Sequence, residues 1–148
     1  MPATGFRLSI DIQAAPEAVF DYLTDFSRHG EWSANPLTIE QVSKGPVGVG
    51  SRFRSRAEVN GLHIEAEFEL TDFQRPLLIA FAGKDSTGKY AHRFKIKPNP
   101  GGTHLVRTIR FELSLRQWLI YQVLLYPVRI PAGRKALRLL KARMEKQP

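Results

Sequence analysis

Two kinds of hydrophobic spacing divide this chain. Apolar residues alternate with polar ones up to Ile12, and the spacing becomes helical after Pro16, a residue that suits the first position of a helix. One face of this helical segment is apolar and carries Val19, Phe20, Leu23 and Phe26. From there to about residue 115 alternation returns, which predicts one helical stretch followed by a long run of antiparallel strands.

The clearest alternation flanks the dipeptide Asn60-Gly61. Ser51 to Val59 and Leu62 to Leu70 both alternate, and Asn-Gly favours a two-residue type I′ turn between them. Paired positions must then sum to 121, which places opposite charges or a charge and an imidazole across from each other: Arg52 and Glu69, Arg54 and Glu67, Arg56 and Glu65, Glu58 and His63. This ladder fixes the register and faces water.

Further strands are predicted by the same pattern. They cover residues 39–43, 77–83, 90–96 and 103–115, with a turn at 84–88 and a loop at 98–102, and with the first strand and the hairpin they make seven. If Ile96 pairs with Leu105, then Phe94 lies opposite Arg107 and His92 opposite Ile109, so that Tyr90, His92 and Arg107 point inward together. A register shifted by one residue places Arg107 outside.

The last segment indicates a terminal helix with a broken beginning. Trp118 to Tyr126 is apolar, Pro127 and Pro131 interrupt the pattern, and a helix is expected from about Ala132 to Lys146. Its apolar positions, which would face the sheet, are Leu137, Leu140 and Met144. The expected fold is therefore α+β: a single domain over residues 1–148, with a curved antiparallel sheet of seven strands, two short helices and a long C-terminal helix that enclose a cavity.

Charge is concentrated at the C-terminal end. The net charge is +8, yet residues 1–115 hold 14 Lys and Arg against 13 Asp and Glu, whereas 116–148 hold eight basic residues against Glu145 alone. One interpretation is a solvated helix face, and the other is peripheral contact of residues 116–148 with an anionic membrane. Nucleic acid is not expected as a partner, because aromatic and basic residues do not interleave. The lack of cysteine and of a signal peptide favours a cytoplasmic protein.

No motif for a specific reaction is present. The four histidines, at 29, 63, 92 and 104, lack metal-ligand spacing, so that neither a metal nor another cofactor is expected. The glycines of residues 45–50 precede neither a helix nor a lysine, and no Gly-x-Ser-x-Gly elbow occurs. No catalytic residue is assigned.

The inner face of the predicted sheet carries the candidate site instead. Small residues on the hairpin leave room there, and a few polar groups lie among apolar ones. Trp32, Tyr90, His92 and Arg107 each have an alternative role as packed or hydrogen-bonded core residues. The residues expected to line the cavity are Trp32, Phe53, Ser55, Ala57, Ile64, Ala66, Phe68, Tyr90, His92, Phe94, Arg107, Ile109 and Phe111.

Four motifs in order resemble a known family. These are the Ala-Pro-Glu-x-Val-Phe helix, Asp25-Phe-Ser-Arg-His-Gly-Glu-Trp32, Pro-Gly-Gly-Thr103 before the last strand, and the terminal Ala-Leu-Arg-Leu-Leu-Lys-Ala-Arg-Met-Glu145. Together they are similar to the polyketide cyclase/dehydrase-like branch of the START-related (SRPBCC) superfamily, and the resemblance covers nearly the whole chain. It implies a helix-grip fold with a hydrophobic cavity between sheet and terminal helix. It does not imply a reaction, because members range from ligand carriers to enzymes.

Two functions of different class follow. The first is binding of a hydrophobic or aromatic small molecule, such as a lipid, isoprenoid, quinone or polyketide. The second is a cyclase or dehydratase reaction, in which His92 or Tyr90 moves a proton and Arg107 holds a developing enolate. Binding is favoured, because no carboxylate clearly faces inward beside an acid or base.

Overall fold

The structure is a computed structural model that describes residues 3–59, 61–85, 88–120, 123 and 126–146. In chain order its elements are β1 (Ala3–Ile12), α1 (Pro16–Thr24), the 3-10 helix η1 (Phe26–Glu31), β2 (Leu37–Gln41), β3 (Arg52–Val59), β4 (Leu62–Gln74), β5 (Leu78–Asp85), β6 (Gly88–Asn99), β7 (Gly102–Glu112), α2 (Leu115–Ile120) and α3 (Tyr126–Lys146).

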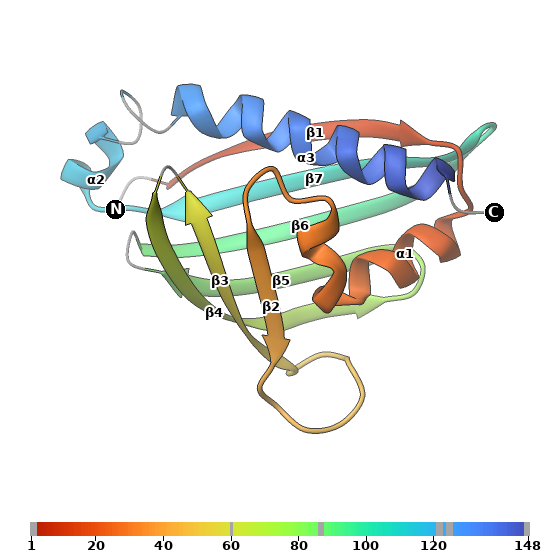
Figure 1. The fold of residues 1–148 in the computed structure, drawn as a ribbon, viewed down its shortest axis with the longest axis horizontal. Coiled ribbons are helices and arrows are strands. Elements are labelled where there is room, and N and C mark those ends of the chain that lie inside the picture. Colours follow the sequence, from red (N-terminus) through yellow and green to blue (C-terminus); the bar gives the residue numbers. More distant parts are fainter. Residues whose placement is uncertain (1–2, 60, 86–87, 121–122, 124–125, 147–148) are drawn as a thin grey trace.

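The strands form one antiparallel sheet of seven strands, in the order β1-β7-β6-β5-β4-β3-β2. The sheet curves around α1, η1 and α3, which cover its concave face, while α2 lies at one end of it (Figure 1). The predicted α+β helix-grip architecture is confirmed. Among the described residues no helix is both long and apolar enough to cross a bilayer.

The β3–β4 hairpin has the predicted register. Val59 pairs with Leu62 and Arg56 with Glu65, so all four predicted cross-strand pairs lie opposite each other. Two of them form ion pairs: Arg54–Glu67 at 3.1 Å and Arg56–Glu65 at 3.3 Å. Gly61 has φ +79°, as a type I′ turn requires, whereas Asn60 lies outside the described residues. Because these pairs are exposed, they specify register more than they add stability.

The β6–β7 register is also the predicted one. Phe94 lies opposite Arg107 and His92 opposite Ile109. The loop expected at 98–102 is shorter than predicted, because Asn99 already pairs with Gly102. Gly102 has φ +141°, and a Cβ there would lie 2.6 Å from the Ile12 carbonyl oxygen. Only glycine lets the last hairpin close against the end of β1.

One end of the concave face is tightly packed. Its residues expose at most 1% of their surface: Phe20, Leu23, Ile79, Phe94, Ile96, Leu105 and Leu140. At this end a bidentate ion pair at 2.9 Å joins Arg75, beside the β4–β5 turn, to Asp21 of α1. Lys141 of α3 donates to the Asp11 carbonyl at 2.7 Å. Both helices are thus fastened to the sheet here.

The C-terminal helix differs from the prediction in its boundaries. It begins at Tyr126 and contains Pro131, rather than starting after that proline. A proline in the second turn removes only one backbone hydrogen bond, so a helix that packs along its length tolerates it. Leu115 was expected on the inner face of the last strand, but it begins α2 and is 65% exposed, because β7 ends at Glu112. Residues 121–122 and 124–125 of the predicted apolar lead-in lie outside the described residues.

Candidate functional site

The thirteen candidate residues fall into two groups by burial. The buried ones, which expose 9% or less, are Trp32, Phe53, Ala66, Phe68, Phe94, Ile109 and Phe111. The residues that are more exposed as a whole are Ser55, Ala57, Ile64, Tyr90, His92 and Arg107, although the Nε atom of Arg107 is itself buried. The strand residues of the second group lie on the inner face, near the end of the sheet that is opposite the packed end. Arg107 is the exception and lies nearer the middle.

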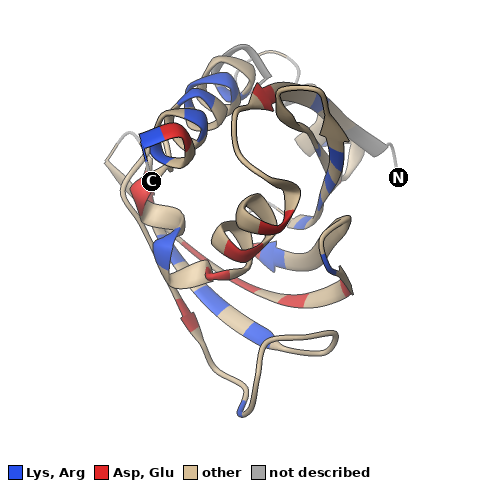
Figure 2. Cartoon of the chain, turned by 90° about the vertical axis from the view of Figure 1, so that its right-hand side faces the viewer, with Lys and Arg blue, Asp and Glu red and all other residues tan. Residues whose placement is uncertain are grey.

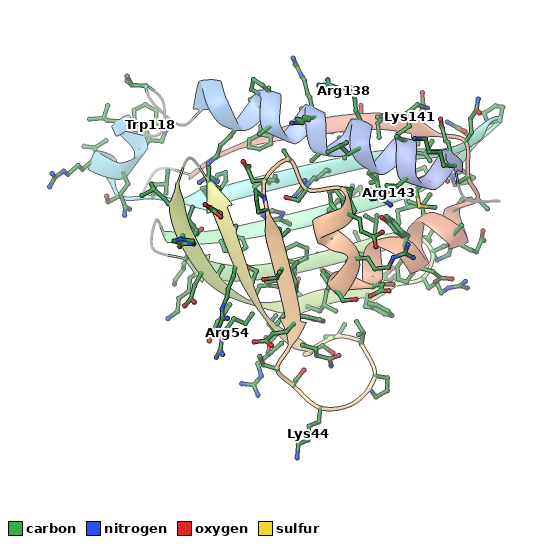
Figure 3. All side chains as sticks on the ribbon, in the orientation of Figure 1. Lys44, Arg54, Trp118, Arg138, Lys141 and Arg143 are labelled. Carbon is green, nitrogen blue, oxygen red and sulfur yellow. The ribbon has the colours of Figure 1, made fainter. Side chains whose placement is uncertain are left out.

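Two separate hydrophobic clusters cover the concave face. The larger one fills the packed end, and a smaller one joins Ile109, Phe111 and Leu113, against which Trp118 of α2 packs (Figure 3). Phe6 and Tyr90 contact both clusters. One large core with a smaller satellite cluster is usual for a domain of this size, and Phe6 and Tyr90 join the two here. His92 and Arg107 lie on neighbouring strands beside the boundary between the clusters.

A hydrogen bond links the two polar groups inside the sheet. Arg107 Nη2 donates to His92 Nδ1 at 3.2 Å. The guanidinium also lies 5.2 Å from the ring centre of Phe94 and 5.5 Å from that of Trp32. Tyr90 meets the edge of His92 at 5.3 Å between ring centres. The inward orientation of all three residues is therefore confirmed.

The charge states of this group follow from burial. Burial lowers the pKa of Arg107 to about 10, so it remains a cation at neutral pH. Burial, together with the cations of Arg107 and Arg129, lowers the pKa of His92 well below its usual range. A neutral His92 that accepts at Nδ1 carries its hydrogen on Nε2. Burial and the charge of Asp85 raise the pKa of Tyr90, so its hydroxyl stays protonated.

Two buried donors in this group have no hydrogen-bond partner among the described residues. They are Nε1–H of Trp32 and Nε–H of Arg107. Trp32 is only 3% exposed and packs against His29 and Phe94, so its alternative role as a packing anchor is also satisfied. An unmatched buried donor is destabilising by about 1–3 kcal/mol, which makes both groups candidates for ligand contact.

His29 is a site neighbour that the sequence analysis did not select. It is 5% exposed, stacks on Phe26 and donates from Nε2 to the Leu23 carbonyl oxygen at 2.7 Å. Burial lowers its pKa to about 4, which keeps the ring neutral. The spacing of Phe26, His29 and Trp32 by three residues was the available signal, because positions i and i+3 align on a 3-10 helix.

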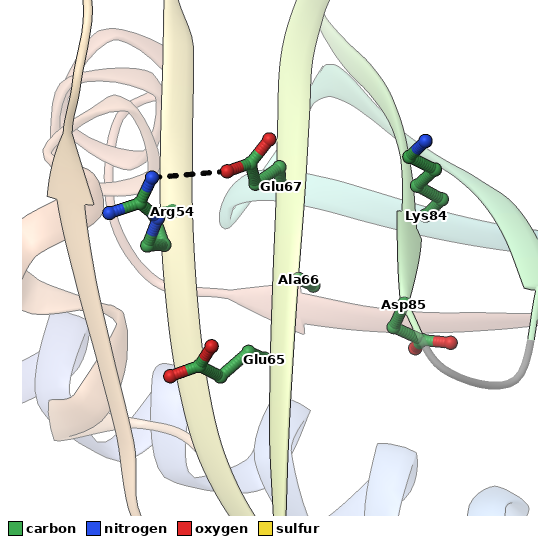
Figure 4. Close-up of a pocket in the computed structure, with 6 residues that line it drawn as sticks. All are labelled: Arg54, Glu65, Ala66, Glu67, Lys84 and Asp85. Carbon is green, nitrogen blue, oxygen red and sulfur yellow. Dashed lines mark hydrogen bonds and ion pairs between the residues drawn. The ribbon is translucent and has the colours of Figure 1, made fainter.

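The hollows in the structure lie mainly on the convex face and at the sheet edges, although His92, Phe53 and Phe68 contribute to the lining of two of them. One of about 240 Å³ on the convex side is lined by Arg54, Glu65, Ala66, Glu67, Lys84 and Asp85, and there Arg54 and Glu67 already pair with each other (Figure 4). Another of about 310 Å³ at the β2 edge includes Ala57 and Ile64 among charged residues. The apolar pocket predicted on the concave face stays a prediction. Among the described residues no cluster of three potential metal ligands occurs.

Comparisons with known proteins identify the family. Residues 3–145 match the model of the family described as polyketide cyclase / dehydrase and lipid transport, and the chain belongs to that family. An uncharacterised protein of Mycobacterium tuberculosis strain H37Rv is 26% identical over 141 residues, which cover 95% of this chain and 90% of that protein.

Solved structures show the same fold at lower identity. A protein of Thermus thermophilus has a TM-score of 0.76 at 20% identity, and the match covers 97% of each chain. A Chromobacterium violaceum protein has a TM-score of 0.76 at 14% identity, over 97% of this chain and 99% of its own.

The buried His29 predicts a pH-dependent stability. Its pKa is about 4 in the folded chain and about 6.5 unfolded, so the unfolded state binds more protons between these values. Stability is therefore lost as pH falls from about 6.5 to 4, by roughly 3 kcal/mol from this residue. His29→Gln keeps a donor for the Leu23 carbonyl and should make the stability fall less as the pH is lowered. The free energy of unfolding is measured in urea at pH 7, 5.5 and 4.

The matched control is His63→Gln on the exposed side of the hairpin, where no burial is relieved. It should retain the wild-type decline. An identical decline in His29→Gln and wild type would contradict the role assigned to His29.

Proposed function

We propose that this protein binds a hydrophobic or aromatic small molecule on the concave face of the sheet. The observation that carries the proposal is the set of partly exposed small and polar residues on the inner face, beside two buried donors that have no partner among the described residues. A ligand there would complete the apolar packing between the clusters and accept hydrogen bonds from Trp32 and Arg107. The lipid-transport part of the family description is consistent with such a ligand.

The same geometry favours binding over a cyclase or dehydratase reaction. A general base needs a free lone pair near neutral pKa, whereas the Nδ1 lone pair of His92 accepts from Arg107 and the pKa of this histidine is lowered. The pKa of Tyr90 is raised instead, so its hydroxyl is a weaker acid than that of an ordinary tyrosine. Neither group is prepared to move a proton at neutral pH.

Filling the concave face tests the proposal. Ala66→Trp places an indole on the inner face opposite Ser55 and should weaken binding of the neutral apolar dye Nile red about tenfold or more. Overpacking would lower stability by about 1–3 kcal/mol without unfolding the domain, which far-ultraviolet circular dichroism checks. Dye affinity is measured by fluorescence titration.

The control is Ala82→Trp, which adds the same group to the convex face, opposite Glu69. It should bind the dye like wild type. If Ala82→Trp blocks the dye and folded Ala66→Trp does not, the ligand occupies the convex face and the proposal fails.

A second function, docking on an anionic membrane, is favoured by a specific observation. Three apolar side chains in and after α2 are exposed: Leu115 by 65%, Leu119 by 53% and Val123 by 72%. They belong to the segment at the partly exposed end of the concave face, and α3 carries many basic residues (Figure 2). Arg134 and Arg138 line a hollow of about 380 Å³ together with Arg7, with no acidic residue in its lining. Docking at this end would place the site next to the bilayer, in which an apolar ligand dissolves.

Vesicle co-sedimentation tests the docking. Wild type should prefer vesicles that contain phosphatidylserine over neutral ones at low salt, and lose the preference at high salt. Arg134→Gln, Lys135→Gln and Arg138→Gln together should weaken binding about tenfold or more, since each basic group near the surface adds up to about 1 kcal/mol. Lys141 is left intact because it bonds to Asp11 and Glu145.

The control variant removes three positive charges from the convex face, with Lys95, Lys97 and Arg110 changed to Gln. It should sediment like wild type. Equal sedimentation of wild type with neutral and anionic vesicles would exclude the docking.

A further inference from the structure

Arg107 is a cation on the inner face that no anion among the described residues matches. It lies in β7 between Phe94 of β6 and Leu8 of β1, a row that continues to Ile79 of β5. No ion pair among the described residues includes it. Its contacts are the neutral His92 and the faces of two aromatic rings.

Acidic residues nearby do not supply the missing charge. Asp85 acts on Tyr90 but lies six residues along β5 from Ile79, about 20 Å from the Arg107 row at the rise of a strand. Glu31 follows His29 in η1, and its carboxylate is held by Arg28 and Tyr22 at 3.1 and 2.8 Å. Burying one unmatched charge is destabilising, so an arrangement of this kind needs a reason beyond packing.

Several polar groups around Arg107 offer N–H donors without an acceptor among the described residues. Nε–H of Arg107 and Nε1–H of Trp32 have no acceptor in the described part of the chain, and the His92 tautomer presents Nε2–H rather than a lone pair. His29 uses its Nε2–H on the Leu23 carbonyl and adds no negative charge. A partner that brings acceptor oxygens and one negative charge would satisfy both the donors and the cation.

We propose that the ligand is an amphipathic carboxylic acid, whose carboxylate pairs with Arg107 and whose apolar part lies along the inner face toward Ser55, Ala57 and Ala66. A carboxylate matches the planar guanidinium and brings one charge to one cation. A phosphate dianion would leave a second charge uncompensated in an apolar site. This inference rests on the proposed function, because it names the chemistry of the ligand at that same site.

A matched ligand set tests the inference. Dodecanoic acid, dodecanol and methyl dodecanoate compete with Nile red in a fluorescence displacement assay at pH 7.5, below their critical aggregation concentrations. Wild type should bind the acid about ten- to a hundredfold tighter than the alcohol or the ester, the range of a charge-assisted hydrogen-bonded pair. Arg107→Met should bind the acid and the alcohol with similar affinity, so that the preference for the acid is lost, and Arg107→Lys should keep part of the preference.

The control is Arg110→Met, which removes an exposed arginine from the other face of the same strand. It should retain the wild-type preference for the acid. Thermal unfolding adds a second readout: dodecanoic acid should raise the Tm of wild type and of Arg110→Met, but not that of Arg107→Met. Without ligand, Arg107→Met should stay close to wild type in stability, because removal of the unmatched cation offsets the loss of its hydrogen bond to His92.

Three results would overturn the inference. They are equal affinity of wild type for acid and alcohol, a preference for the acid that persists in Arg107→Met, and a large loss of Tm in ligand-free Arg107→Met and Arg107→Lys alike, which would make Arg107 a structural residue. Binding of dye and alcohol without preference for the acid leaves the proposed function standing. If neither dye nor alcohol binds, the proposed function fails together with the inference.

Discussion

The pairing of β6 with β7 is the constraint on which the interior of this domain depends. In the observed register Arg107 lies opposite Phe94 and points inward, next to His92. Because successive strand residues face opposite sides, a slip of β7 by one position would move the guanidinium to the convex surface, beside Lys95 or Arg93, and turn Val106 or Thr108 inward. The short turn between Asn99 and Gly102 prevents that slip.

The two ends of the sheet then serve different purposes. At one end α1 and α3 are fastened by the Asp21–Arg75 ion pair and by Lys141, above side chains that are almost completely buried. That end holds most of the packing that keeps the domain folded. At the other end lies the smaller cluster, and small residues replace aromatic ones on β3 and β4. A ligand could occupy the second end without disturbing the first, which is how one small domain can combine stability with binding.

The sequence predicts the sheet better than it predicts the site. Alternation and Asn-Gly determine the hairpin register because both are local, and the β6–β7 register follows from a short loop. The start of α3 was missed because Pro131 normally ends a helix, and packing against β1 overrides that preference. The unmatched charge of Arg107 could not be predicted from local patterns. It depends on whether an acidic side chain from any of four separate segments reaches the guanidinium. His29 is different, because its three-residue spacing from Phe26 and Trp32 is visible in the sequence and matches a 3-10 helix.

The location of the ligand can be measured directly with methyl groups that the sheet already presents on both faces. In protein labelled with ¹³C at alanine methyls, Ala57 and Ala66 report on the concave face, and Ala82 and Ala91 on the convex face. Intermolecular nuclear Overhauser effects from bound dodecanoic acid should reach the methyls of Ala57 and Ala66 and leave those of Ala82 and Ala91 without cross-peaks. Cross-peaks confined to Ala82 and Ala91 would contradict binding on the concave face.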